Sequence, residues 1–222
     1  MKIIDLTHLI TESMPVYPGF EPPKLHIACD HDEYGFRETY IGLYSHTGTH
    51  IDAPAHLFPD GLSLDQYPVT QFVGKALVID CRKLEKREKI SMSLLEDKGS
   101  VLYEADFLLF LTGHSNLWGK PDYFSDFPVV SNEVAEWINS RKLKGIGIDA
   151  PSFDFVEAEE PEGNGDELPI HRLILQTNHT ILLENLCNLA AIGYDLFTLC
   201  ALPLHTQNAD GAPARIIAII EP

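Results

Sequence analysis

The chain has 222 residues, 45% of them hydrophobic, which is enough to bury a substantial core without the help of disulfides. Lysine and arginine total 16 against 33 aspartates and glutamates, and the formal net charge of -17 repels nucleic-acid phosphates and anionic lipid surfaces. We therefore expect one domain over residues 1–222 that binds neither nucleic acid nor a membrane.

The cysteines are widely spaced and form no CxxC pair; they are Cys29, Cys81, Cys187 and Cys200. Most stand in apolar surroundings, which indicates buried, reduced thiols rather than a disulfide framework. The start of the chain, MKIIDLTHLI, reaches Asp5 after a short apolar run, so we expect neither a signal peptide nor a membrane-spanning helix. These features predict a cytoplasmic protein.

Short apolar runs, punctuated by Gly and Pro, indicate partly or fully buried β-strands along most of the chain. In chain order they cover residues 2–8, 24–30, 37–45, 75–81, 106–113, 144–149, 180–184, 197–204 and 214–220. Strands thus outnumber helices and alternate with them in a mixed order. The pattern predicts an α/β fold.

Helical patterns are fewer. The clearest covers residues 131–143, where Ser131 is suited to cap the first turn and apolar residues recur at helical spacing. A second covers residues 169–177, with Pro169 in the first turn. The acidic stretch before it, residues 157–169, lacks periodicity, and we expect a mobile surface connection there rather than a functional lid.

Residues 46–56 read HTGTHIDAPAH, which concentrates imidazole and carboxylate groups in one short segment. Glycine, β-branched residues and proline disfavour a helix here, so we expect a strand that leads into a turn. Alternate side chains of a strand share one face, which places His46, His50 and Asp52 together.

Distance then requires a bend in this segment. A straight strand separates His46 from His50 by roughly 13 Å, so we expect a bulge or bend at Gly48, which also leaves space for an ion. Pro54 forces the preceding residue out of helical geometry and turns the chain, and this turn brings His56 back towards the same centre.

Imidazole nitrogens and carboxylate oxygens without thiolate suit an exchangeable divalent ion of the zinc or manganese kind, and hydrolysis is its natural chemistry. The alternative is that these groups are ordinary hydrogen-bonded residues, but leaving all of them buried and unpaired is costly. His171 and Glu184 stand near apolar runs, and each alone is as well explained as a surface residue. Together with Asp52 they would complete a second metal position bridged by that carboxylate.

The segment HTGTHIDAPAH resembles the pattern HxGTHxDxPxH of the cyclase family, which includes bacterial kynurenine formamidases and isatin hydrolases. The resemblance extends along nearly the whole chain. Similar segments are IDLTHLITESMPVYPG, GTHIDAPAHLFPDGLSLDQYP, GIGIDAPSFD, PIHRLILQTNHTILLENLCNL and ALPLHTQNADGAPARIIAII.

This resemblance implies a swivelling β/β/α domain with a β-barrel-like mixed sheet flanked by helices. It implies one or two divalent ions per chain, Zn or Mn, and a homodimer or homotetramer whose active sites are completed by a neighbouring chain. The residues it assigns to the site are His46, His50 and Asp52 for one ion, Asp52, His171 and Glu184 for a second, and His56 as the catalytic histidine.

The leading functional hypothesis is a metal-dependent hydrolase of a carbon–nitrogen amide bond in a small substrate, similar to kynurenine formamidase, with His56 as a general acid and base that titrates near neutrality. An isatin hydrolase-like lactam hydrolase is the alternative within the enzyme class. A non-catalytic protein in which the ion only stabilises the fold is the alternative from another class.

Other aromatic and histidine side chains carry weaker expectations. One set could line an aryl pocket, although we favour the interpretation that its members are core residues: Tyr17, Phe20, Phe58, Trp118 and Phe124. Two further histidines, His114 and His205, stand in loops after strands, where functional sites commonly lie.

Overall fold

The computed structural model describes residues 1–155, 168–193 and 196–221. The α-helices are α1 (His31–Tyr34), α2 (Met92–Glu96), α3 (Asn132–Arg141) and α4 (Pro169–Leu175). The strands are β1 (Lys2–Asp5), β2 (Lys24–Cys29), β3 (Glu38–Gly42), β4 (His50–Asp52), β5 (Val73–Asp80), β6 (Lys89–Ile90), β7 (Phe107–Leu111), β8 (Val129–Val130), β9 (Gly145–Ile148), β10 (Ile181–Glu184), β11 (Phe197–Pro203) and β12 (Gly211–Ile220). Every strand expected from an apolar run is present, β4 forms within the histidine segment, and the short β6 and β8 were not expected.

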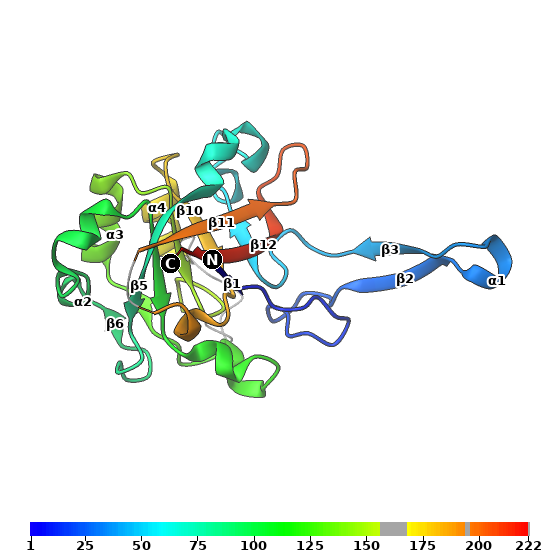
Figure 1. Cartoon of the computed structure of the whole chain (residues 1–222), viewed down its shortest axis with the longest axis horizontal. Coiled ribbons are helices and arrows are strands. Elements are labelled where there is room, and N and C mark those ends of the chain that lie inside the picture. Colours follow the sequence, from blue (N-terminus) through cyan, green and yellow to red (C-terminus); the bar gives the residue numbers. More distant parts are fainter. Residues whose placement is uncertain (156–167, 194–195, 222) are drawn as a thin grey trace.

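The main sheet closes on itself. Its strands follow the order β12, β11, β5, β7, β9, β10 and β4, and β4 pairs back with the start of β12. β1 pairs with the end of β12, on the edge opposite β11. β5, β7, β9 and β10 run parallel, and the remaining neighbours are antiparallel. This closed, barrel-like mixed sheet with helices packed beside it confirms the expected fold class (Figure 1).

Alternation along the strands produces two apolar cores. One lies inside the ring and includes Leu109 and Leu183. The other lies between the outer face of the ring and the helices, and includes Leu108 and Leu182 together with Ile174 of α4. His50, Asp52 and Glu184, which are described below, stand at strand positions on this outer face, because their neighbours Ile51 and Leu183 point into the ring.

The two expected helices are confirmed, each slightly shorter than the sequence pattern. α3 begins after Ser131, whose hydroxyl accepts a hydrogen bond from the backbone N–H of Val134 at 3.3 Å, and it ends at Lys142 in a left-handed conformation. α4 begins with Pro169. A backbone N–H at the first position of a helix has no partner within the helix, so proline loses no hydrogen bond there.

β2 and β3 form a separate two-stranded sheet that projects from the body of the molecule, with α1 at its tip (Figure 1). Asp30 caps α1 by accepting hydrogen bonds from the N–H groups of Asp32 and Glu33. The strands were expected to be partly buried, but most of their residues are exposed, among them Ile27, Tyr40 and Ile41.

Three further expectations concern the cysteines, a membrane-spanning helix and the acidic connection. All of the cysteines are free thiols, with Cys81 and Cys187 buried. Within the described ranges, no helix combines the length and the apolar character needed to cross a bilayer. The acidic connection expected over residues 157–169 lies, up to residue 167, outside the described residues.

Candidate metal centre

The histidine segment bends at the predicted place. Gly48 adopts a left-handed conformation with φ of +66°, and a Cβ there would meet the side chain of Met14 at 2.8 Å. The strand β4 begins only at His50, and His46 lies in a turn, so the expectation that His46 shares a strand face is wrong. The bend, rather than strand parity, brings the His46 and His50 rings to a centroid distance of 5.2 Å.

Pro54 has the predicted effect on the chain. Ala53 is extended, and residues Pro54–His56 form one turn of 3-10 helix directly after it. This turn folds the chain back so that the ring of His56 lies with its centroid 3.9 Å from that of His46. His56 therefore reaches the same centre as the other two histidines of the segment.

A first triad is built from this segment alone. The Nδ1 atom of His46 lies 2.6 Å from Oδ1 of Asp52, and Nε2 of His50 lies 3.0 Å from the same oxygen. The three candidate ligand atoms lie within 4.8 Å of one another. His50 and Asp52 are buried, while His46 is partly exposed.

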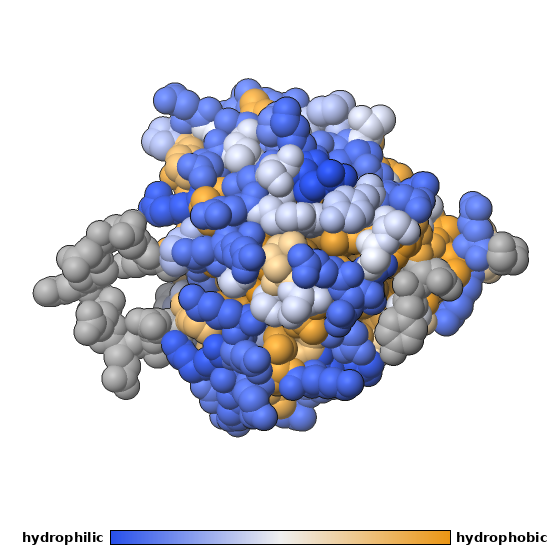
Figure 2. All heavy atoms as spheres, turned by 90° about the vertical axis from the view of Figure 1, so that its left-hand side faces the viewer, coloured by the Kyte–Doolittle hydropathy of each residue, from blue (hydrophilic) through white to orange (hydrophobic). Residues whose placement is uncertain are grey.

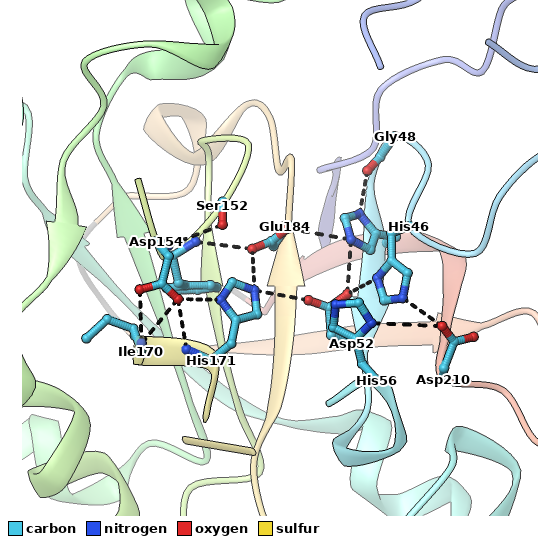
Figure 3. Close-up of polar contacts among 12 residues, drawn as sticks. His46, Gly48, Asp52, His56, Ser152, Asp154, Ile170, His171, Glu184 and Asp210 are labelled. Atoms are coloured by element: carbon cyan, nitrogen blue, oxygen red, sulfur yellow. Dashed lines mark hydrogen bonds and ion pairs between the residues drawn. The ribbon is translucent and has the colours of Figure 1, made fainter. Parts of the chain in front are cut away.

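A second triad shares Asp52 and adds residues distant in sequence. Glu184 lies at the end of β10, directly opposite His50 in the antiparallel pairing with β4. His171, on α4, places Nε2 at 3.4 Å from Oδ2 of Asp52 and at 3.1 Å from Oε1 of Glu184. Asp52 thus presents one carboxylate oxygen to each triad, and all three side chains are buried (Figure 3).

Each histidine of the two triads has a separate acceptor for its other ring nitrogen. Nδ1 of His50 donates to the carbonyl of Gly48 at 2.8 Å, and Nδ1 of His171 donates to Asp154 at 2.7 Å. Nε2 of His46 donates to Asp210 at 3.0 Å. These bonds set the tautomer of each ring and turn the remaining nitrogen towards the shared centre, which is the outer support that metal-binding histidines require.

Asp154 explains how α4 holds its histidine in place. The residue before the helix, Leu168, offers no capping side chain, and the Asp154 carboxylate accepts hydrogen bonds from the N–H groups of Ile170 and His171 instead. The same carboxylate accepts from the His171 ring. One buried aspartate therefore fixes both the start of α4 and the orientation of its ligand.

Asp154 and Asp210 are site residues that the sequence interpretation missed. Asp210 precedes β12, accepts hydrogen bonds from His46 and Ser45, and lies 3.9 Å from Nδ1 of His56. The available signal was an aspartate in a loop that joins two strands, within the segment NADG. Gly211 beside it is required because a Cβ there would meet Nε2 of His46 at 2.8 Å.

The pKa values of these groups follow from burial and mutual attraction. Burial lowers the pKa of His46, but attraction to Asp52 and the bond to Asp210 raise it to about 10. Burial raises the pKa of Asp52, but the neighbouring histidines His46 and His50 hold it well below its usual range. Proton-bearing histidines between carboxylates are positions where a divalent ion can replace protons, and the nitrogen and oxygen donors suit such an ion.

His56 differs from the expectation. Burial is the main cause that lowers its pKa to about 4, and the positive charges of His46 and His171 add to this effect. The prediction that His56 titrates near neutrality is therefore wrong for this structure. The ring is neutral at pH 7 and can accept a proton.

The two triads open into a cavity of about 580 Å³. Aromatic side chains line it on one side: Tyr17 and Phe20 from the segment after β1, Tyr44 after β3, and Phe124. The expectation that Tyr17, Phe20 and Phe124 belong to the core is wrong. Of the same predicted set, Phe58 packs against the outer core and Trp118 stacks on His8.

The two weaker histidine candidates lie outside this cavity. The ring of His114 is buried, and its Nε2 donates to the backbone carbonyl of Tyr123 at 2.6 Å. The preceding loop is held by Asp149, whose carboxylate accepts bonds from Thr112 and Gly113. His205 is exposed at the surface. His114 thus has a structural role in shaping the loop that carries Tyr123.

Comparison with known proteins shows which family the chain resembles. The family model described as putative cyclase matches residues 4–155. A kynurenine formamidase from Bacillus cytotoxicus is 31% identical over 99% of this chain and 97% of its own length.

Solved structures are similar as well. Isatin hydrolase A from Labrenzia aggregata, solved with benzyl benzoate, superposes with a TM-score of 0.83 at 25% identity, over 99% of this chain and 94% of its own. A structure described as a potential metal-dependent hydrolase with cyclase activity has a TM-score of 0.75 at 28% identity, over 100% of this chain and 99% of its own. The chain belongs to the cyclase family.

Proposed function

We propose that the protein is a metal-dependent hydrolase that cleaves a carbon–nitrogen amide bond in a small aryl substrate, with N-formylkynurenine, converted to kynurenine and formate, as the leading candidate. The observation that carries this proposal is the pair of triads that share Asp52 at the base of a cavity walled by aromatic side chains. The similarity to kynurenine formamidase along the whole chain supports the choice of substrate.

We propose two ion positions per chain, filled by Zn or Mn. His46, His50 and Asp52 would hold one ion, and Asp52, His171 and Glu184 the other, because Asp52 directs Oδ1 to one group and Oδ2 to the other. When bound, a divalent ion lowers the pKa of water and polarises a carbonyl group.

The role of His56 follows from its neutral ring. Water adds to the carbonyl carbon of the amide, and His56 accepts the proton that this water loses. The same histidine returns a proton to the leaving nitrogen as the carbon–nitrogen bond breaks, so that the products are an amine and a carboxylic acid. Asp210 lies 3.9 Å from Nδ1 of His56, where it can attract the positive charge that His56 gains.

A lactam hydrolase of the isatin kind is the second candidate, favoured by the similarity to isatin hydrolase A. A screen of N-formylkynurenine, isatin and simple lactams decides between the two. Elemental analysis of the purified protein identifies the bound ion. Turnover of N-formylkynurenine above the lactams supports the proposal. The opposite preference would replace it with the second candidate.

A non-catalytic metal protein is the remaining alternative. A chelator titration that follows melting temperature and amide hydrolysis together separates it from the enzyme, because a purely structural ion affects melting alone. His56→Ala should retain its metal and lose more than about 100-fold in turnover. Loss of the metal along with activity would make His56 a ligand instead.

We also propose that the protein is a homodimer built around the β2–β3 hairpin, or a homotetramer of such dimers. An isolated two-stranded hairpin is only marginally stable in water, and this one exposes Tyr40 by 61% and Ile41 by 59%. The face on the opposite side of the molecule is mostly hydrophilic (Figure 2). A second copy that covers the hairpin would also lie near the cavity, since Tyr44 follows β3.

Light scattering tests this assembly, with Ile41→Lys as the variant that should dissociate it. A wild-type monomer would contradict it. We further propose that residues 1–222 act as one domain, since the first and last strands pair with each other. The free thiols support a reducing, cytoplasmic location.

A further inference from the structure

We infer that the side-chain amide of Asn185 is a substrate-binding group, which donates a hydrogen bond to the carbonyl oxygen of the substrate, and that Tyr123 is the positioning residue that aims it. This inference rests on the proposed function for the kind of substrate, an aryl compound with a carbonyl group. Asn185 follows directly after Glu184 and lines the same cavity.

Asn185 is held at every polar group except one. Its backbone N–H donates to the carbonyl of Ala150 at 3.0 Å, and its own carbonyl accepts from the Thr49 hydroxyl at 2.6 Å. Its side-chain Oδ1 accepts from the hydroxyl of Tyr123, also at 2.6 Å. These bonds hold the side chain in a single orientation. The backbone of Asn185 adopts a left-handed conformation with φ of 55°.

The orientation of the amide follows from Tyr123. The phenol is fully buried, and the only acceptor that its hydroxyl has among the described residues is Asn185. A buried hydroxyl without an acceptor is costly, so the oxygen of the Asn185 amide must face Tyr123 and the nitrogen must face away. Tyr123 is itself fixed at its backbone by the ring of His114.

The amide nitrogen is left with two N–H donors and, within the described ranges, no protein acceptor. Asn185 is only 7% exposed and lines the cavity, so the protein shields most of this amide and the cavity is where its free donor meets a ligand. A hydrogen bond from such a donor to an oxygen of a ligand lowers the free energy of binding. A carbonyl oxygen is the matching acceptor, because an amide nitrogen donates and cannot accept.

A competing explanation is that Asn185 is present only because asparagine tolerates the left-handed conformation. Asn185→Asp separates the two explanations. Aspartate keeps the size, the backbone preference and the oxygen that accepts from Tyr123, and it replaces the free donor with an acceptor. Asn178→Asp is the matched control, because Asn178 is also left-handed, with φ of 55°, and its Oδ1 accepts from the N–H of Leu62 outside the cavity.

The test uses metal-loaded protein and two probes that contain no carbon–nitrogen bond. Acetophenone has an aryl carbonyl oxygen and ethylbenzene has none, and ligand-detected NMR titration gives the dissociation constant of each. Asn185→Asp should weaken acetophenone binding by about 10-fold relative to ethylbenzene, while Asn178→Asp leaves the ratio unchanged. Tyr123→Phe should reduce the ratio partially, because the amide is then free to rotate.

Metal content and melting temperature are measured for every variant, so that a folding or metal defect is recognised. An Asn185→Asp protein that keeps its metal and the wild-type ratio of the two probes would overturn the inference. A protein that hydrolyses no amide in the substrate screen, yet loses the preference for acetophenone on this substitution, would retain the inference while the proposed reaction fails.

Discussion

The two triads that share Asp52 are built in different ways. The first is local: a left-handed glycine and one proline fold eleven consecutive residues, 46–56, until their histidines and aspartate meet. The second is assembled from β4, from β10 beside it and from α4, so it depends on strand pairing and on the packing of a helix. The difference separates what backbone chemistry alone determines from what requires the whole fold.

The outer support of the triads differs in the same way. His171 is held by Asp154, which is buried beneath α4, whereas His46 is held by Asp210, whose side chain is 46% exposed. Water screens the His46–Asp210 pair more than the His171–Asp154 pair. We therefore expect mutations around the second triad to be more damaging to the fold, although both triads lose their ligands when Asp52 changes.

The largest expected effect is that of Asp52→Asn, because both triads lose a charged ligand at once. We expect metal affinity to fall by more than about 100-fold at both positions, beyond the loss typical of a supporting residue, and activity to disappear. Metal content after dialysis and the rate of amide hydrolysis measure this. Retention of one ion at wild-type affinity would show that the triads do not share Asp52.

Separate removal of one ligand from each triad is the next test. His50→Ala and His171→Ala should each reduce metal content from about two ions per chain to about one, since each leaves the other triad with its own residues. Elemental analysis gives the stoichiometry. Complete loss of metal in both variants would indicate a single site in place of two.

The supporting aspartates sharpen the comparison further. Asp154→Asn should weaken metal binding by about 10- to 100-fold and also lower the melting temperature, because it removes a buried charge that caps α4. Asp210→Asn should weaken metal binding by about 10-fold, the lower end of that range, and its melting temperature should stay near that of the wild type. Metal titration and calorimetry compare the two variants directly. Equal losses of stability in the two variants would contradict the expectation that the buried aspartate matters more for the fold.

The smallest expected effect is that of Gly48→Ala. The left-handed backbone and the contact with the flexible end of Met14 should destabilise the folded state by about 1 kcal/mol. Metal loss should be confined to the first triad. Gly19→Ala is a suitable control, because Gly19 is also left-handed, with φ of 92°, but a Cβ there meets nothing within 4 Å. An equal loss of metal from both triads would show that the first is not built locally.

The sequence was most informative where chemistry and chain geometry are local. The apolar runs predicted the strands, and Gly48 and Pro54 predicted the bends that bring His46, His50 and His56 together. The closure of the sheet could not be obtained in this way, because the pairing of β4 with both β10 and β12 depends on contacts between distant segments.

The residues that were missed share one feature. Asp154 and Asp210 act on histidines that are 17 and 164 positions away in the chain, so no local pattern connects them. The aromatic side chains that line the cavity were expected in the core for the same reason: Tyr17 and Phe124 meet only in the folded chain. The second triad could be suggested from the sequence, but His171 and Glu184 were each as well explained as surface residues until the family resemblance assigned them to the site.

Anomalous scattering from crystals of the metal-loaded protein tests the central claim most directly. The account predicts two peaks in each chain, one bounded by Nδ1 of His46 and Nε2 of His50, the other by Nε2 of His171 and Glu184, with Asp52 between them. Crystals of protein shown to contain metal that scatters elsewhere, with neither position marked, would contradict it.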